Sequence, residues 1–320
     1  MQQQRRSFTV CGLVFHPLFQ QCTEAAAYLQ QEHSAEYYVE VFREVPRDFY
    51  ARRQRMVAER QLDSDAVEVF VLQGDGAAMS GEAFLQHVQE QTHFRVLKVP
   101  AASADSYENT ALASWKKFLQ QRGNSYCWMD VTIGEVARGR ITFELYAQVV
   151  PRTCNNFWHL CKGDLGTVVP VHQRSSITSD GQQQQQQEED EKAVELSYRG
   201  ATFFRILHGA WVMGGDVSAG HSGKGGYSCY GRYFPNESHA VPHDAPGVLG
   251  MCNDGEDTNA SSFYITMKPM SWMDGRYVAF GRVMDGMEVV EAIHAVDVKH
   301  NQSPRETITI SDCGVIDLTD

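Results

Sequence analysis

The sequence predicts two domains: an α/β domain first, and after it a mainly-β closed barrel with two helices. The chain has 320 residues, which exceeds the usual length of one small domain. Strand and helix patterns alternate over roughly the first hundred residues, whereas short apolar strand patterns dominate the later part. The stretch between these two parts is rich in small and polar residues, which is typical of a linker.

In the first domain the predicted elements follow the order β-α-β-α-β-β-α. A nearly continuous apolar run predicts the first strand, and apolar residues on one face predict each helix. Asp75 and Gly76 form the expected hairpin turn, and Ser80 is a suitable N-cap for the last helix. The predicted strands and helices cover residues 8–15, 17–29, 37–42, 47–61, 66–72, 77–79 and 80–88.

This order resembles thioredoxin and glutaredoxin domains, and we assign residues 7–98 to a thioredoxin-like domain. Redox chemistry in that family needs a low-pKa thiol where the first strand meets its helix. Residues 16–19 occupy that junction without a cysteine, and Cys22 lies one turn further on the apolar face of the helix. The proline that the family carries before its third strand is Val67 here. The resemblance therefore implies the fold without its redox site, and docking or spacing is the expected role.

Two irregular stretches separate or interrupt the domains. Residues 99–124 are expected to form a linker around one short helical stretch at 111–121. Residues 163–192 contain a run of glutamines followed by four acidic residues. Because such a composition cannot build a core, we expect a solvated surface insertion.

Residues 125–320 form the second predicted domain. Pro151 suits the first position of a helix, in which Cys154, Phe157 and Leu160 share the buried stripe. Many antiparallel strands with two helices are typical of a small closed barrel. The predicted strands cover residues 127–133, 140–145, 201–207, 248–252, 263–266, 279–283 and 307–310, and the second helix covers residues 287–295.

Composition excludes several classes of function. The formal net charge is −12 and no basic cluster occurs, which argues against binding to nucleic acid. The eight cysteines form no Cys-x-x-Cys pair and no zinc-ligand spacing with histidine. No apolar stretch reaches the roughly 18 residues that a membrane span needs, and no secretory leader pattern opens the chain. We therefore expect a cytoplasmic protein that is not associated with a membrane. We expect it to need neither a metal nor an organic cofactor.

Six motifs of the second domain follow one another in the order found in the cyclophilin family. The match runs from about Tyr126 to Ile316 and is interrupted mainly by the glutamine-rich insertion. The sequence thus resembles a cyclophilin, which implies a cyclophilin-like closed barrel and peptidyl-prolyl cis-trans isomerase activity on X-Pro bonds. The added N-terminal domain and Trp211 point to a divergent branch of this family. The motifs lie at residues 143–157, 204–216, 247–251, 258–265, 272–275 and 278–287.

Isomerisation of an X-Pro bond requires little from its catalyst beyond shape and charge. Rotation about a peptide bond costs about 18–20 kcal/mol because resonance is lost. A catalyst must hold the proline ring in an apolar pocket and aim a donor at the twisted amide. Arg205 carries a permanent charge and several donors, and the resemblance implies that it is the catalytic arginine. Position alone would also allow a surface strand residue.

The resemblance also implies a substrate-binding groove with apolar and aromatic walls. Trp272 matches the tryptophan at the groove edge that favours cyclosporin in the family. The residues that fall at groove positions are Trp211, Met213, Met251, Cys252, Asn253, Tyr264, Trp272, Met273 and Tyr277.

Several groove positions depart from the family pattern. Ala210, Trp211 and Met213 stand where the family usually has phenylalanine, methionine and glutamine. Tyr264 replaces a phenylalanine and Tyr277 a histidine. Loss of the glutamine amide removes a hydrogen bond worth about 1 kcal/mol, and loss of the phenylalanine removes pocket area. We therefore expect reduced turnover and weak or no cyclosporin binding.

Two functions remain open at this point. The first is a cyclophilin-type isomerase of reduced activity that acts on proline-containing protein clients. The second is a non-catalytic scaffold that docks proline-bearing partners within a larger assembly. Because the divergent branch occurs mainly in ciliated or flagellated organisms, the resemblance also implies an axonemal partner and a place in the cilium or flagellum.

Two further patterns look like sites but fail on spacing. Residues 220–226 resemble a phosphate-binding loop, yet the glycine spacing differs and no serine or threonine follows the lysine. His239 and His243 are four residues apart, but Pro242 breaks the helix that a metal-binding pair would need. We interpret the first as a structural turn and assign no metal to the second.

Overall fold

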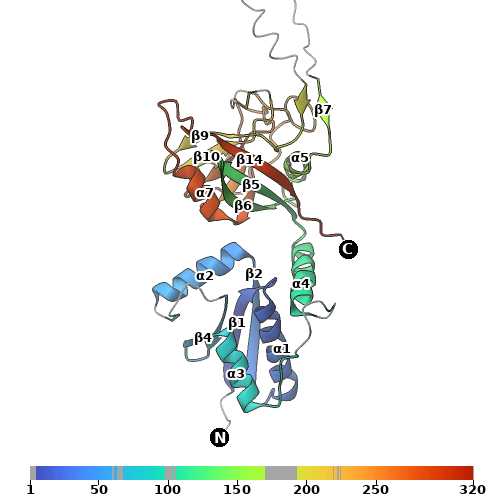
Figure 1. Cartoon of the computed structure of the whole chain (residues 1–320), viewed down its shortest axis with the longest axis vertical. Coiled ribbons are helices and arrows are strands. Elements are labelled where there is room, and N and C mark those ends of the chain that lie inside the picture. Colours follow the sequence, from blue (N-terminus) through green and yellow to red (C-terminus); the bar gives the residue numbers. More distant parts are fainter. Residues whose placement is uncertain are drawn as a thin grey trace, which may run out of the picture. The chain divides into compact units, whose positions relative to one another are not determined.

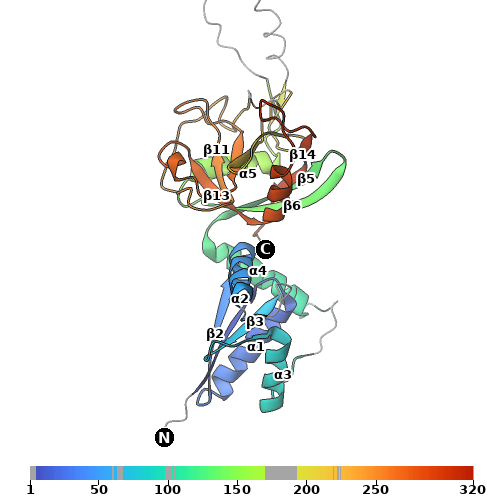
Figure 2. The ribbon, with the colours of Figure 1, turned by 90° about the vertical axis from the view of Figure 1, so that its left-hand side faces the viewer.

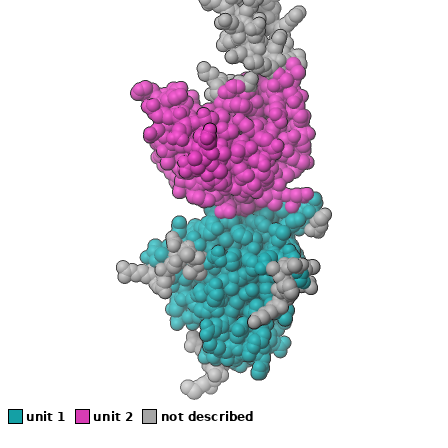
Figure 3. All heavy atoms as spheres, in the orientation of Figure 1, with its two compact units in different colours: residues 1–122, 318–320 teal, residues 123–317 magenta. Residues whose placement is uncertain are grey.

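The structure is a computed structural model, in which the chain divides into two compact units (Figures 1 and 3). They comprise residues 1–122 with 318–320 and residues 123–317. Each unit has its own sheet and its own hydrophobic core. The described residues are 5–59, 61–62, 68–97, 103, 106–169, 193–218, 220–221, 223 and 225–319.

Four strands form the mixed sheet of the first unit, in the order β2-β1-β3-β4. β1 pairs in parallel with β2, whereas the β1–β3 and β3–β4 pairs are antiparallel. The predicted N-cap is confirmed, because the Ser80 hydroxyl accepts the Ala83 N–H at 3.2 Å. The elements are β1 (Arg6–Leu13), α1 (Pro17–Glu32), β2 (Tyr37–Glu44), α2 (Pro46–Ala58), β3 (Val69–Gln73), β4 (Ala78–Ser80) and α3 (Gly81–Gln91).

Helices cover both faces of this sheet (Figure 2). On one face, Phe8 and Val10 of β1 pack in a core with residues of α1 and α3. On the other face, Cys11 and Leu13 pack with Phe49 of α2. Successive residues of a strand point to opposite faces, so the continuous apolar run of β1 is what this layered arrangement requires.

A further helix, α4 (Tyr107–Arg122), lies where the sequence analysis expected a linker with a shorter helical stretch. Trp115 and Phe118 of α4 pack against the core of the first unit. The ring of Phe15 also contacts Trp115, with 5.3 Å between the ring centroids. Residues 106–122 are therefore part of the first unit. Val67 lies outside the described residues.

Eight antiparallel strands form the sheet of the second unit, in the order β14-β5-β6-β13-β11-β12-β10-β9. The two end strands meet at a bridge between Thr202 and Thr309, and the Ile310 N–H donates to the Ala201 carbonyl at 2.9 Å. The sheet is thus a nearly closed barrel, as predicted. The strands are β5 (Ser125–Ile133), β6 (Val136–Leu145), β9 (Phe203–Leu207), β10 (Trp211–Gly214), β11 (Val248–Met251), β12 (Phe263–Thr266), β13 (Ala279–Asp285) and β14 (Ile308–Val315).

Two helices pack on this barrel, α5 (Pro151–Lys162) and α7 (Met287–His294) (Figure 1). Both contribute buried residues to the barrel core, among them Phe157 and Ile293. A small ribbon of β7 (Thr167–Val168) and β8 (Val194–Glu195) brings the ends of the predicted insertion together. The glutamine run itself lies outside the described residues.

Among the described residues, no helix combines the length and the apolar character needed to cross a lipid bilayer. All eight cysteines are free thiols, and six of them are buried.

Candidate functional site

The candidate site lies on the outer face of the barrel, where three neighbouring strands align their side chains. Arg205 on β9 pairs directly with Met213 on β10, and Met213 pairs with Tyr264 on β12. Directly paired residues share one face of a sheet. The alternate residues of these strands, such as Val212 and Ile265, fill the barrel core. Arg205, Met213 and Tyr264 therefore form one outward row.

The guanidinium of Arg205 is exposed at one end of this row. Among the described residues it has no hydrogen-bond or ion-pair partner, which leaves its donors available to a ligand. Burial raises the pKa of the nearby Cys252 thiol, and the charge of Arg205 lowers it, so the two groups are within electrostatic reach. The predicted catalytic arginine thus sits beside a predicted groove residue.

A buried apolar cluster lies next to the arginine and contains most of the predicted groove residues. Trp272 is 50% exposed at its rim, and Tyr264 is 1% exposed beneath it. Trp272 lies in the short helix η1 (Ser271–Met273) that follows β12. The cluster comprises the buried Ala210, Tyr264, Met270 and Met273, together with Leu207, Trp211, Met213, Cys252 and Tyr277.

Aromatic rings connect the rim of this cluster to its interior. The ring of Trp272 lies 6.0 Å from that of Trp211 and 6.3 Å from that of Tyr277, centroid to centroid. Tyr277 in turn meets Tyr264 edge to face at 6.1 Å. Such a chain of rings offers an apolar surface with aromatic edges, which suits contact with a proline ring.

Two predicted groove residues lie elsewhere. Met251 pairs with Phe263 on the inward face of the sheet, and both side chains are wholly buried in the barrel core. The side chain of Met251 therefore faces the barrel core and does not belong to the outward row that carries Met213 and Tyr264. Asn253 is half-buried in the loop after β11, next to Cys252.

A chain of buried polar side chains lies behind the cluster, and no sequence pattern predicts it. The imidazole of His243 is wholly buried, with Nδ1 2.7 Å from Asp274 Oδ1 and Nε2 2.6 Å from the Tyr264 hydroxyl. An ionised carboxylate can only accept, so Nδ1 donates to Asp274, while Nε2 shares a hydrogen bond with the Tyr264 hydroxyl. His243 lies in an irregular stretch without periodicity, so only the fold reveals this role.

The same histidine connects two segments that carry groove residues. Its backbone N–H donates to Asp274 at 2.8 Å, and its carbonyl accepts the Met270 N–H at 2.7 Å. The Tyr264 hydroxyl lies over Gly250, where a Cβ atom would clash with it. The chain Asp274–His243–Tyr264 thus holds the cluster interior against the segment that carries Trp272.

The glycine-rich stretch after β10 is a loop closed on a buried carboxylate. Asp216 accepts the N–H groups of Gly223 at 2.7 Å and of Gly225 at 3.2 Å. It also accepts the N–H and the hydroxyl of Ser218. These N–H groups point at Asp216 and are not free for a phosphate, in agreement with a structural turn. Among the described residues, no group of three or more His, Cys, Asp and Glu could hold a metal ion.

The barrel, its outward arginine and the aromatic cluster define the class of protein. A sequence model of the family described as cyclophilin type peptidyl-prolyl cis-trans isomerase/CLD matches residues 128–315. The chain belongs to this family.

Comparison with individual relatives narrows the class to one branch. The chain is 31% identical over 309 residues to the human "Probable inactive peptidyl-prolyl cis-trans isomerase-like 6", covering 95% of this chain and 90% of that protein. It is 34% identical over 210 residues to the mouse protein of the same name, covering 66% of this chain and 59% of that protein. The mouse NK-tumor recognition protein is 36% identical over 190 residues, which are 59% of this chain and 12% of that protein. The similarities support the peptidyl-prolyl isomerase-like 6 branch, although the chain spans about three fifths of the mouse relative in that branch.

Removal of one hydroxyl tests the buried polar chain. Tyr264→Phe is expected to lower the free energy of unfolding of the second unit by about 1–3 kcal/mol, because the buried Nε2 of His243 loses its partner. Chemical denaturation measures the change. Tyr277→Phe is the matched control, since its hydroxyl has no hydrogen-bond partner among the described residues, and should stay within about 0.5 kcal/mol of wild type. Equal losses in both variants would contradict the assignment.

The same chain predicts a dependence of stability on pH. The side-chain and backbone hydrogen bonds of His243 hold the pKa of Asp274 below its usual value. A carboxyl group whose pKa is lower in the folded than in the unfolded state stabilises the fold at pH values above its unfolded pKa. This stabilisation is lost as the pH falls through the folded pKa. The stability difference between wild type and Asp274→Asn should therefore be full at neutral pH and shrink below about pH 4. A difference that stays constant in denaturation curves across this range would refute the prediction.

Proposed function

We propose that the second unit is a cyclophilin-type peptidyl-prolyl isomerase of reduced turnover, which acts on X-Pro segments of protein clients. The observation that carries this proposal is the exposed guanidinium of Arg205, which no described residue pairs, beside an aromatic cluster with a half-exposed tryptophan. The cluster receives the proline ring, and Arg205 donates to the substrate amide as its nitrogen regains a lone pair. The donor acts only on the twisted state, so it lowers the barrier to rotation.

Reduced turnover follows from the residue opposite the arginine. Met213 pairs with Arg205 across β9 and β10, and its thioether cannot donate a hydrogen bond to a substrate or orient the guanidinium. Loss of one such hydrogen bond is worth about 1 kcal/mol, or about fivefold in rate. The relatives named as probable inactive isomerases fit this reduction.

Exchange NMR on a short X-Pro peptide tests the proposal. With the wild-type chain, cis and trans peptide signals should show exchange broadening. Met213→Gln should increase the exchange rate about fivefold, because an amide then stands beside Arg205. Peptide binding without exchange in both proteins would refute turnover, and absence of binding would refute the groove itself.

Met213 also favours a second function, that of a non-catalytic scaffold. A chain whose groove retains its aromatic cluster but not its orienting amide is suited to hold a proline segment without turning it over. We propose this non-catalytic scaffold as the alternative. From the resemblance alone, we also propose an axonemal or other assembly partner and a location in the cytoplasm, cilium or flagellum. Chemical-shift changes of the peptide without broadening favour the scaffold. Weak or no cyclosporin binding is expected in either case.

For the first unit we propose a thioredoxin-like fold that serves docking and has no redox activity. The sheet order β2-β1-β3-β4 with one parallel pair supports this fold. Burial raises the pKa of Cys11 and of Cys22 to about 12, so neither thiol supplies the thiolate that disulfide exchange needs. The chain should therefore fail to reduce insulin disulfides, and any turnover would refute this assignment.

A further inference from the structure

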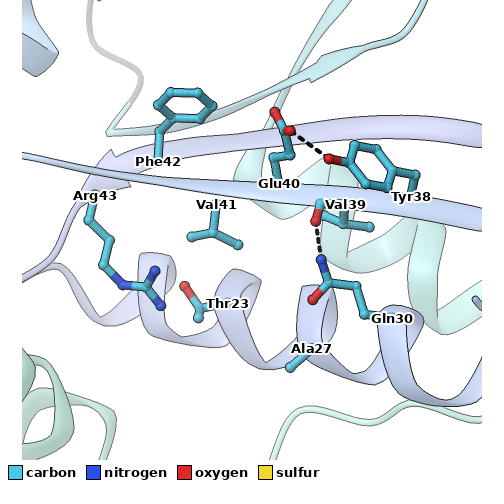
Figure 4. A pocket seen from close by; sticks show the side chains of 9 residues that line it. All are labelled: Thr23, Ala27, Gln30, Tyr38, Val39, Glu40, Val41, Phe42 and Arg43. Carbon is cyan, nitrogen blue, oxygen red and sulfur yellow. Dashed lines mark hydrogen bonds between the residues drawn. The ribbon is translucent and has the colours of Figure 1, made fainter.

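A groove opens in the first unit between helix α1 and strand β2, far in sequence from the proline site. Its volume is about 520 Å³. Figure 4 shows that Thr23, Ala27 and Gln30 line it from α1, while Val41 and Arg43 line it from β2. Strand β2 is an edge of the four-stranded sheet, so the groove runs along a strand with only one neighbour.

The backbone of this edge strand has unused hydrogen-bonding groups. The Glu36 carbonyl accepts the Arg6 N–H of β1, so the alternate residues from Glu36 onward direct their N–H and carbonyl groups toward β1. The residues between them direct their backbone N–H and carbonyl groups away from β1. The first of these is Tyr37, whose N–H donates to the carbonyl of His33, the C-cap residue of α1.

The outward backbone groups of the next residues show which part of the edge lacks hydrogen-bond partners. The Val39 carbonyl accepts from the Gln30 side chain (Figure 4). For Val41 and Arg43, which follow at the same spacing, the described residues provide no partner to the outward N–H and carbonyl groups. Natural sheet edges are protected by charged side chains, proline or bulges, and β2 carries charges but neither proline nor a bulge: its pairing with β1 runs through eight residues without interruption.

The charges along this strand differ between its two faces. Arg43 points toward α1 and has no ion-pair partner within the described part of the chain, whereas Glu40 lies on the opposite face and accepts the Tyr38 hydroxyl at 2.7 Å. Tyr38 and Phe42 are 48% and 42% exposed on that opposite face. Within the described residues, the α1 side of β2 therefore presents the unpaired cation of Arg43 and two backbone positions without a partner, while Glu40, which also lines the groove, is hydrogen-bonded to Tyr38.

We propose that β2 binds an extended segment of a protein partner as a fifth strand, with an acidic side chain of that segment paired to Arg43. The backbone groups of Val41 and Arg43 supply the ladder hydrogen bonds, which give affinity regardless of sequence. Arg43 supplies the preference for an acidic side chain, and the exposed rings of Tyr38 and Phe42 cover the other face of the added strand.

The test uses the full chain and a proline-free peptide, so its outcome is independent of the proline site. The probe is a soluble peptide of about eight residues that alternates valine and threonine around one glutamate. Binding should protect the Val41 and Arg43 amides from hydrogen exchange. Arg43→Gln should weaken binding about tenfold, and a glutamine version of the peptide should lose the same factor.

Val41→Pro separates strand addition from simple charge attraction. It removes an outward N–H, while the amides of Tyr38 and Glu40 still face β1 and should stay protected. This variant should abolish binding, and Arg138→Gln, which removes an exposed arginine of β6, should leave it unchanged. Binding that survives Val41→Pro, or no binding at millimolar peptide, would overturn the proposal. It would also be overturned if the peptide protected amides outside β2 from hydrogen exchange, or if protection of the β2 amides rose with protein concentration without any peptide.

Discussion

Arg205→Ala is expected to lower the rate of X-Pro exchange about 100-fold, which is the size of effect seen when a donor that acts on a transition state is removed. Peptide affinity should change little, because the aromatic cluster that contacts the proline ring is left intact. The expected result is therefore loss of exchange broadening while the chemical shifts of the bound peptide persist. Exchange NMR with wild type and variant measured side by side gives both quantities.

A matched arginine on the same barrel controls for the loss of charge. Arg138 is exposed on β6, outside the cluster, and Arg138→Ala should retain the wild-type exchange rate. Arg205→Lys keeps the charge but not the planar fork of donors, so its rate should lie between those of wild type and Arg205→Ala. Exchange that continues undiminished in Arg205→Ala would rule out the arginine as the catalytic donor.

Arg282→Ala is expected to lower the free energy of unfolding of the second unit by about 3–5 kcal/mol. Glu144 on β6 is wholly buried, and its carboxylate accepts from Arg282 Nε and from Asn124 Nδ2, each at 2.9 Å. Removing the arginine takes a charged hydrogen-bond donor away from a buried carboxylate, which costs more than the pair itself contributes. Denaturation followed by hydrogen exchange of β6 and β13 amides assigns the loss to this unit.

An exposed ion pair provides the comparison. Arg199 pairs with Asp312 at 2.6 Å, but its side chain is 66% exposed, so Arg199→Ala should cost less than about 1 kcal/mol. Adding Glu144→Gln to Arg282→Ala should recover part of the lost stability, because no buried charge then remains. If the two single arginine variants lose the same stability, the burial argument is wrong.

The local pattern was sufficient for elements with a strong period. The predicted strand at residues 263–266 has the same bounds as β12, and the helix at Pro151 begins where proline favours it. β10 was not predicted, because the glycines on either side of Trp211, Val212 and Met213 indicate an irregular return after β9 and not a strand. The helix α4 begins before the predicted residues 111–121, at Tyr107, whose hydroxyl donates to Glu24 of α1, a residue distant in the chain.

The candidate site was likewise predictable in part from the sequence, and the rest depends on tertiary contacts. Motif order identified Arg205 and the aromatic residues, and their roles in substrate binding stay predictions. The inward position of Met251 and the buried partners of His243 depend on strand register and on contacts between segments that are distant in sequence. No local pattern carries that information.

By itself, the amino-acid sequence determined the two-part organisation, the kind of barrel and the candidate arginine, because periodicity and ordered motifs are local properties. Only the tertiary structure decided which side chains meet: Met213 beside Arg205, Tyr264 bonded to His243, and an open strand edge next to Arg43. Pairing across a sheet is set by which strands become neighbours, and that choice depends on packing of the whole unit.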